Sequence, residues 1–138
     1  MLIRSFQPAD QDAVIALWDR CGLIRPVNDP KKDIARKMRV QPELFLVGLI
    51  DGKLAATAMA GYDGHRGWIN YFGVAPEYRR RGLGRMMMAE AEKRLRALRC
   101  PKINLQVLRD NRAACDFYNR IGFKEDEVLS FGKRLDED

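Results

Sequence analysis

The sequence has 138 residues, of which 46% are hydrophobic and 32% charged, and a formal net charge of +6. This length suffices for one domain with a single core, so we predict that residues 1–138 form a single domain. No apolar run approaches the roughly 18 residues that span a bilayer, and the start of the chain lacks the apolar segment of a signal peptide, so we expect a cytoplasmic protein without membrane contact.

The residue types that usually carry metal or thiol chemistry are sparse. Cys21, Cys100 and Cys115 are widely spaced and include no CxxC pair, so neither a disulfide framework nor a zinc site is predicted. The single histidine, His65, lies in a Gly-rich turn, and a metal site or a Ser/Cys-His centre would depend on it alone. We therefore expect no metal.

The positive charge favours an anionic partner, but it does not choose among nucleic acid, a membrane surface and a phosphorylated cofactor. Its only dense cluster runs from Arg79 to Arg85, where the arginines neighbour glycines. The aromatic side chains that stack on nucleic-acid bases are not interleaved with them. This distribution favours a compact anion site over a nucleic-acid interface.

Hydrophobic periodicity predicts a mixture of helices and strands. Apolar residues spaced three and four apart indicate helices, alternation indicates strands, and Asp51-Gly52 is typical of a tight turn between antiparallel strands. The elements expected in the first half are a strand over 2–6, helices over 10–22 and 34–41, and three consecutive strands over 44–50, 53–62 and 68–74. Those expected in the second half are a long helix over 83–99, a strand over 103–107, a helix over 111–121, and one or two final strands within 123–135.

This order of elements predicts an α/β fold of the mixed α+β kind. We expect a mostly antiparallel sheet of six or seven strands flanked by about four helices. The long helix joins the strand over 68–74 to the strand over 103–107, and a right-handed crossover of this kind makes the two strands parallel.

The segment RRRGLGR, residues 79–85, joins a strand to a helix and predicts a phosphate cradle. A helix N-terminus leaves backbone N–H groups unpaired and carries a partial positive charge, so an anion gains hydrogen bonds there. Gly82 and Gly84 let the backbone turn sharply and let a pyrophosphate approach, while the arginines add attraction. The alternative interpretation is a tight turn whose arginines form a solvated face.

Two other phosphate-binding loops do not fit. A P-loop needs GxxxxGK followed by Ser or Thr, and no such string occurs. The dinucleotide fingerprint GxGxxG would place its third glycine at Met87, and it belongs to a parallel βαβ unit rather than to the end of an antiparallel meander.

Two segments of the sequence resemble those of a known family. Residues 79–84, RRRGLG, fit the [Q/R]xxGx[G/A] pattern of the GNAT family of N-acetyltransferases, and the preceding YFGVAPEY resembles that family's central strand. The segment NRAACDFYNRIGF, residues 111–123, is similar to the family's helix with an Asn near its start and a Tyr seven residues later. The resemblance covers nearly the whole chain. The segments IRPVNDP, GYDGHRGW and FGKRL further resemble bacterial YpeA-type acetyltransferases.

The resemblance implies an N-acetyltransferase that uses acetyl-CoA as cosubstrate and a primary amine of a small molecule, peptide or protein as acceptor. The cofactor would enter between two splayed parallel strands, where backbone groups of residues 72–74 pair with its pantetheine arm. The implied cofactor-binding residues are Phe72, Gly73, Val74, Arg79, Arg80, Arg81, Gly82, Leu83, Gly84, Arg85 and Asn111.

The resemblance also makes Tyr118 the general acid, which would protonate the coenzyme A thiolate as it departs. The other interpretation is a core tyrosine, because Tyr118 shares a helix face with Ala114 and Ile121.

The general base is not identified. The ribosomal-protein alanine acetyltransferases of the family carry a glutamate where this chain has Gln106, and the histone-type lysine acetyltransferases carry one where it has Trp68. The remaining candidates are Glu77, Asp29, Asp63 and a water chain passing Asn70 or Tyr71.

The missing base lends support to a second hypothesis, a non-catalytic acyl-CoA-binding or regulatory module. The acceptor amine is not identified by these residues. Members of the family pair through different strands, so a homodimer is compatible with the sequence without being selected by it.

Overall fold

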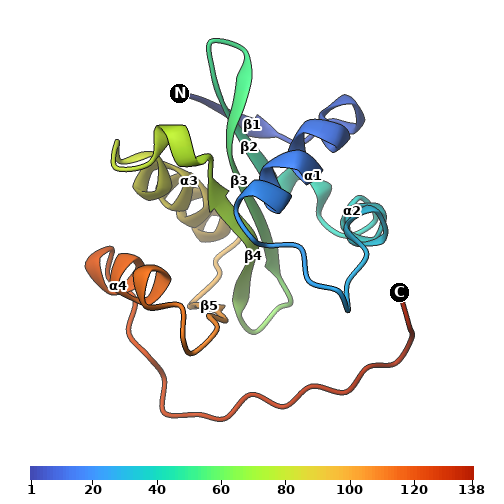
Figure 1. The fold of residues 1–138 in the computed structure, drawn as a ribbon. Coiled ribbons are helices and arrows are strands. Elements are labelled where there is room, and N and C mark those ends of the chain that lie inside the picture. The colour runs from blue at the N-terminus through green and yellow to red at the C-terminus, as the bar shows by residue number, and fades with distance from the viewer.

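The computed structural model describes residues 1–138 and contains one five-stranded sheet with four α-helices (Figure 1). The spatial order of the strands follows the chain; β1 to β4 pair antiparallel with one another, and β5 pairs parallel with β4. The strands are β1 (Leu2–Ser5), β2 (Phe45–Ile50), β3 (Lys53–Tyr62), β4 (Gly67–Val74) and β5 (Ile103–Leu105). The helices are α1 (Gln11–Arg20), α2 (Pro30–Lys37), α3 (Leu83–Ala97) and α4 (Arg112–Arg120), with short 3-10 turns at Pro8–Asp10, Pro42–Leu44 and Pro76–Tyr78. The predicted mixed class, antiparallel meander and parallel pair are confirmed.

The helices cover both faces of the sheet, with α1 and α2 on one side and α3 and α4 on the other (Figure 1). Strand β2 shows how the sequence specifies this arrangement. Leu46 belongs to the apolar cluster under α3, while its neighbours Phe45 and Val47 belong to the cluster under α1. Successive side chains of a strand point to opposite faces, so a strand covered on both faces needs a continuous apolar run, as residues 44–47 provide.

The prediction of six or seven strands is wrong, because the final strands within residues 123–135 do not form. No backbone–backbone hydrogen bond involves residues 124–138, and β5 ends at Leu105 instead of Val107. Alternating apolar residues indicate that a segment is able to form a strand, but a strand also needs a neighbouring edge with which to pair. Here the segment leaves α4 and runs below the sheet towards α2 (Figure 1).

Helix α2 begins earlier than predicted because its cap lies in the preceding loop. The side chain of Asp29 accepts hydrogen bonds from the backbone N–H groups of Lys31 and Lys32, at 2.9 and 3.3 Å. Pro30 then occupies the first helical position, where a missing N–H has no cost. None of the helices has the length and apolar content needed to cross a membrane.

A buried hydroxyl connects three elements. The indole N–H of Trp18, which is 0% exposed, donates to Thr57 Oγ1 at 3.1 Å, and the Thr57 hydroxyl donates to the backbone carbonyl of Tyr71 at 2.9 Å. Thr57→Val would leave both partners buried without a hydrogen bond, so we expect the free energy of unfolding in urea to fall by about 1–3 kcal/mol. Thr57→Ser keeps both bonds and should lose less. Equal losses in the two variants would contradict the importance of the hydroxyl.

Candidate active site

Strand β4 contains a bulge where the residues predicted to pair with the cofactor, 72–74, begin. Two of its residues, Tyr71 and Phe72, stand opposite a single residue of β3, Ala58. Tyr71 has a φ of 48°, in the left-handed region that an aromatic residue seldom adopts. A bulge bends its strand and re-aims the side chains that follow.

Beyond the bulge, β4 separates from its parallel neighbour. The ladder joins residues 67–69 of β4 to residues 103–105 of β5, and no pairing continues along residues 70–74. The side chains of Phe72 and Val74 pack with the α3 and α4 cluster, while Tyr71 packs with the α1 cluster. The splayed pair is therefore present, and residues 72–74 lie on its open edge.

Gly73 is close to the end of α1 on the other side of this edge. A Cβ at this residue would lie 3.1 Å from Leu23 Cδ1 and 3.2 Å from Cys21 Sγ. The thiol of Cys21 also donates to the carbonyl of Val74 at 3.4 Å. The small residue thus lets the loop after α1 approach the open edge of β4.

The start of α3 offers a row of unpaired donors. The chain turns from β4 into the helix through two left-handed residues, Arg80 with a φ of 64° and Gly82 with a φ of 77°. The first N–H to find a backbone acceptor is that of Met86, which donates to the Gly82 carbonyl at 3.1 Å. No protein group accepts from the backbone N–H groups of residues 80–85. Together with the helix dipole, these donors form a site suited to an anion.

Gly84 has a packing function that the sequence did not reveal. A Cβ there would lie 2.9 Å from Cζ of Phe117 and 3.8 Å from Cε1 of Phe72. The missing side chain therefore lets α4 lie against the first turn of α3. Leu83, next to it, is buried at 7% exposure, so the first residue of the helix faces the interior.

The predicted arginines are all exposed but differ in their contacts. Arg79 donates from Nε to the Val74 carbonyl at 3.1 Å, and the guanidinium of Arg81 lies 5.6 Å from the centre of the Tyr78 ring. Arg80 and Arg85 form no hydrogen bond or ion pair through their side chains, which leaves both available to an anion at the helix start.

Tyr118 has features of both a core tyrosine and a general acid. Its ring packs against Phe72, Phe117 and Phe123, with centroid distances of 6.0, 5.2 and 5.7 Å. Its hydroxyl forms no hydrogen bond within the protein, and burial raises the pKa of Tyr118 to about 12. The ring is thus part of the core and packs on Phe72 of β4, while the hydroxyl remains protonated and has no partner within the protein.

Asn111 serves first as a helix cap. Its Oδ1 atom accepts a hydrogen bond from the backbone N–H of Ala114 at 3.2 Å, at the start of α4. The Nδ2 group has no protein partner, so one donor of this side chain stays available.

Neighbouring groups make two of the candidate bases poorer proton acceptors. Glu77 forms an ion pair with Arg20, and this hydrogen bond lowers the pKa of the Glu77 carboxyl. Asp63 accepts from the backbone N–H groups of Arg66 and His65, at 2.7 and 2.8 Å, which lowers its pKa. A carboxylate with a lowered pKa is a poorer proton acceptor.

The third candidate base, Asp29, is also engaged, as are Gln106 and Trp68, which stand where relatives carry a glutamate. Asp29 caps α2, Gln106 donates to Ser130 Oγ at 2.5 Å, and the indole of Trp68 donates to Asp63 at 3.4 Å.

The structure also shows a pair that sequence reasoning missed. The hydroxyl of Tyr71 donates to Asp33 Oδ2 at 2.5 Å, and its ring stacks on Trp18 with a centroid distance of 3.8 Å. Burial, followed by the bond to Asp33, raises the pKa of Tyr71. The two residues are 38 positions apart, and neither carries a local motif, so no sequence signal joined them.

Comparisons with known proteins agree with this geometry. Residues 7–123 match the Acetyltransferase (GNAT) family. Acetyltransferase ECA0875 of Pectobacterium atrosepticum is 46% identical over 138 residues, which are 100% of this chain and 98% of that protein.

Two solved structures share the fold. Ard1 from Thermoplasma volcanium aligns with a TM-score of 0.81 and 27% identity, over 89% of this chain and 82% of that one. The PaiA N-acetyltransferase from Thermoplasma acidophilum, in complex with coenzyme A, aligns with a TM-score of 0.82 and 20% identity, over 93% and 92%. The chain therefore belongs to the GNAT acetyltransferase family and is an N-acetyltransferase, an enzyme of the acyltransferase class.

Proposed function

We propose that the protein transfers the acetyl group of acetyl-CoA directly to a primary amine of a small molecule, peptide or protein. One observation carries this proposal: unpaired backbone N–H groups over residues 80–85 lie at the start of α3, next to the splayed end of β4. The ring of Tyr118 packs on Phe72 of the same strand. The coenzyme A in the related PaiA structure supports a cofactor of this class.

The cofactor would be held mainly by backbone groups. The amides of residues 80–85 would bind the pyrophosphate, with the side chains of Arg80 and Arg85 adding charge. Residues 72–74 would pair with the pantetheine amides as an added strand does, and the free Nδ2 of Asn111 would donate to the same arm. Acetyl-CoA supplies the activated acyl group.

The transfer forms a C–N bond between the amine and the acetyl carbonyl carbon, and it breaks the C–S bond. The backbone N–H of Val74 would stabilise the negative charge that develops on the carbonyl oxygen. Tyr118 would donate its hydroxyl proton to the departing sulfur and recover a proton from solvent.

The attacking amine must also lose a proton, because an alkyl ammonium with a pKa of about 10.4 is not nucleophilic. Glu77 is paired with Arg20, Asp29 caps a helix, and Asp63 is occupied by a turn. We therefore propose that water accepts this proton.

The test is turnover. The protein is incubated with acetyl-CoA and a panel of polyamines, aminoglycosides, amino acids and peptides, while free thiol and acetylated amine are measured. We expect equal amounts of both products with at least one amine.

The engaged carboxylates favour one alternative, a binding module without catalysis. Calorimetry with coenzyme A separates the two: binding without turnover across the whole panel would support the module and reject the enzyme mechanism. Duplex DNA serves as the control ligand and should not bind.

A further inference from the structure

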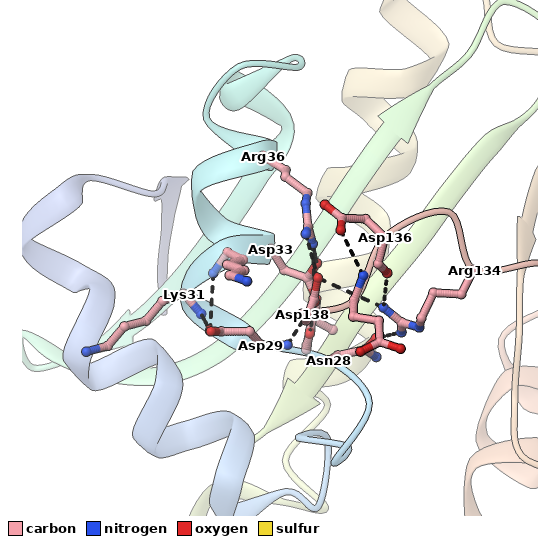
Figure 2. A network of polar contacts seen from close by, with 11 residues as sticks. Asn28, Asp29, Lys31, Asp33, Arg36, Arg134, Asp136 and Asp138 are labelled. Atoms are coloured by element: carbon pink, nitrogen blue, oxygen red, sulfur yellow. Dashed lines mark hydrogen bonds and ion pairs between the residues drawn. The ribbon is translucent and has the colours of Figure 1, made fainter.

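A carboxylate of the chain itself is bound beside α2. The Asp138 side chain accepts hydrogen bonds from the backbone N–H of Asp29 at 3.0 Å and from the two Nη atoms of Arg36 at 2.6 and 3.3 Å, as Figure 2 shows. Only 5% of this side chain is exposed. Two guanidinium nitrogens on two carboxylate oxygens form the paired geometry by which arginine recognises a carboxylate. Asp29 and Arg36 therefore make a carboxylate site, which Asp138 fills.

The segment that carries Asp138 is held by few contacts. Residues 124–138 contain no helix or strand, and none of their backbone groups pairs with another backbone group. Leu135, the apolar residue nearest to Asp138 in the sequence, is 91% exposed. The other side chains of the segment that bond to the rest of the protein are those of Asp126, Ser130 and Arg134. A segment with few buried contacts opens at a low free-energy cost, so another carboxylate is able to replace that of Asp138.

Space and positive charge adjoin the bound carboxylate. An open cavity of about 520 Å³ is lined by Arg36 on one side and by residues 132–136 and Asp138 on the other. Its basic lining residues are Arg36, Lys133 and Arg134. Once Asp138 is displaced, these three bases face a single acid, Asp136, and this balance favours an anionic ligand.

A series of hydrogen bonds connects the carboxylate site with the splayed strand. Arg36 also donates to Asp33 Oδ1 at 2.9 Å, and Asp33 Oδ2 accepts from the hydroxyl of Tyr71 at 2.5 Å. Tyr71 directly precedes residues 72–74, the open edge of β4. The side chains of Tyr71 and Asp33 thus lie between that edge and Arg36. A molecule that reaches both places needs several bonds between its reacting group and its carboxylate.

We propose that the acceptor is an amine that carries a carboxylate several bonds away, and that this carboxylate replaces Asp138 on Arg36 and the Asp29 N–H. The inference rests on the proposed acetyl transfer and adds an acceptor class and a form of regulation. Asp138 is an internal competitor, and its attachment to the chain gives it a high effective concentration. An acceptor with its own carboxylate displaces it, whereas a neutral amine has no group that takes its place.

The carboxylate site is tested first without catalysis. The probe is the peptide N-acetyl-Ala-Ala-Asp amide, whose blocked amine cannot be acetylated, and N-acetyl-Ala-Ala-Asn amide is its uncharged control. Nuclear magnetic resonance follows the backbone N–H signal of Asp29 and the mobility of residues 134–138. The acidic peptide should shift the Asp29 signal and make residues 134–138 more mobile, while the control peptide should do neither.

Three variants assign the contacts through the dissociation constant of the acidic peptide. Asp138→Ala should lower it by about fivefold or more, because the tethered competitor is gone. Arg36→Gln should raise it by about tenfold or more, since the paired guanidinium is lost. The fold should survive, because the Arg36 side chain is 50% exposed. Arg39→Gln, at an exposed arginine one turn further along, should change nothing.

The double variant Arg36→Gln/Asp138→Ala should bind the peptide as Arg36→Gln does, because the competitor acts through the same guanidinium. Equal affinity of the unchanged protein for the two peptides would overturn the proposal. So would an affinity that neither Asp138→Ala nor Arg36→Gln changes.

Turnover then tests the acceptor class. With acetyl-CoA, the kcat/KM for ε-aminocaproate should exceed that for its neutral amide by about tenfold or more, the loss expected for one charged hydrogen-bonded contact. Asp138→Ala should lower the KM for the acid and leave that for the amide unchanged. Glycine, whose amine and carboxylate are close together, should be a poorer acceptor than ε-aminocaproate.

The two arms separate this inference from the proposed function. Acetylation of the amide at least as fast as the acid would overturn the acceptor class and leave acetyl transfer intact. Binding of the acidic peptide without turnover of any amine would reject acetyl transfer, and with it the acceptor assignment, while supporting the carboxylate site.

Discussion

Tyr118→Phe is expected to lower kcat by about 10²–10⁴-fold while leaving the affinity for coenzyme A nearly unchanged. The hydroxyl has no partner within the protein, so its removal leaves no buried group unsatisfied. The ring contacts with Phe72 and Phe117 remain, because phenylalanine keeps the same shape. The effect should therefore fall on proton transfer to the departing thiolate and not on folding or binding.

Thiol release under saturating substrates measures kcat, and calorimetry measures the affinity for coenzyme A. Tyr62→Phe is the matched control, since the Tyr62 hydroxyl donates to the Gly64 carbonyl at 3.3 Å, and Tyr62 lies opposite Gly67 at the start of β4, where β4 and β5 are still paired. An unchanged kcat in Tyr118→Phe would reject its role as the general acid. A large loss of coenzyme A affinity would show instead that the hydroxyl serves in binding.

The features that sequence reasoning predicted depend on residues that are neighbours along the chain. The start of α3 is one example: Gly82 suits a left-handed turn, and the apolar spacing after it specifies a helix, so the place of the unpaired amides follows from a short stretch. The meander is another, because the positive φ of Asp51 and Gly52 closes a hairpin between two apolar runs. Local rules decide such features.

The features that sequence reasoning missed depend on contacts between residues that are far apart along the chain. Residues 123–135 contain apolar side chains that suit a strand, but the sequence could not show that this segment is held at α2 through Asp138 instead of pairing with β5. The bond between Tyr71 and Asp33 joins β4 to α2 with no motif at either end. Partners far apart along the chain are chosen by tertiary packing, which a periodicity analysis does not contain.

Gly84→Ala tests whether Gly84 is needed for packing against α4 or for contact with the cofactor. The added Cβ would lie 2.9 Å from Phe117 Cζ, so the ring must move, and Tyr118 on the same helix should move with it. We expect kcat to fall by about tenfold or more, since a small misplacement of a catalytic group is costly. The fold should survive, because alanine favours a helix by about 1 kcal/mol over glycine and overpacking costs about 1–3 kcal/mol.

A second substitution distinguishes the two explanations. If crowding by Phe117 causes the loss, Gly84→Ala/Phe117→Leu should recover most of kcat, because the smaller side chain makes room. If Gly84 is needed only so that a phosphate can approach the backbone, the double variant should stay as impaired as Gly84→Ala. Gly82→Ala is the control: no atom lies within 4 Å of its Cβ, and its φ of 77° makes alanine strained by about 1–2 kcal/mol. Phe117→Leu should not rescue it, because that strain lies in the backbone and not in the contact with α4.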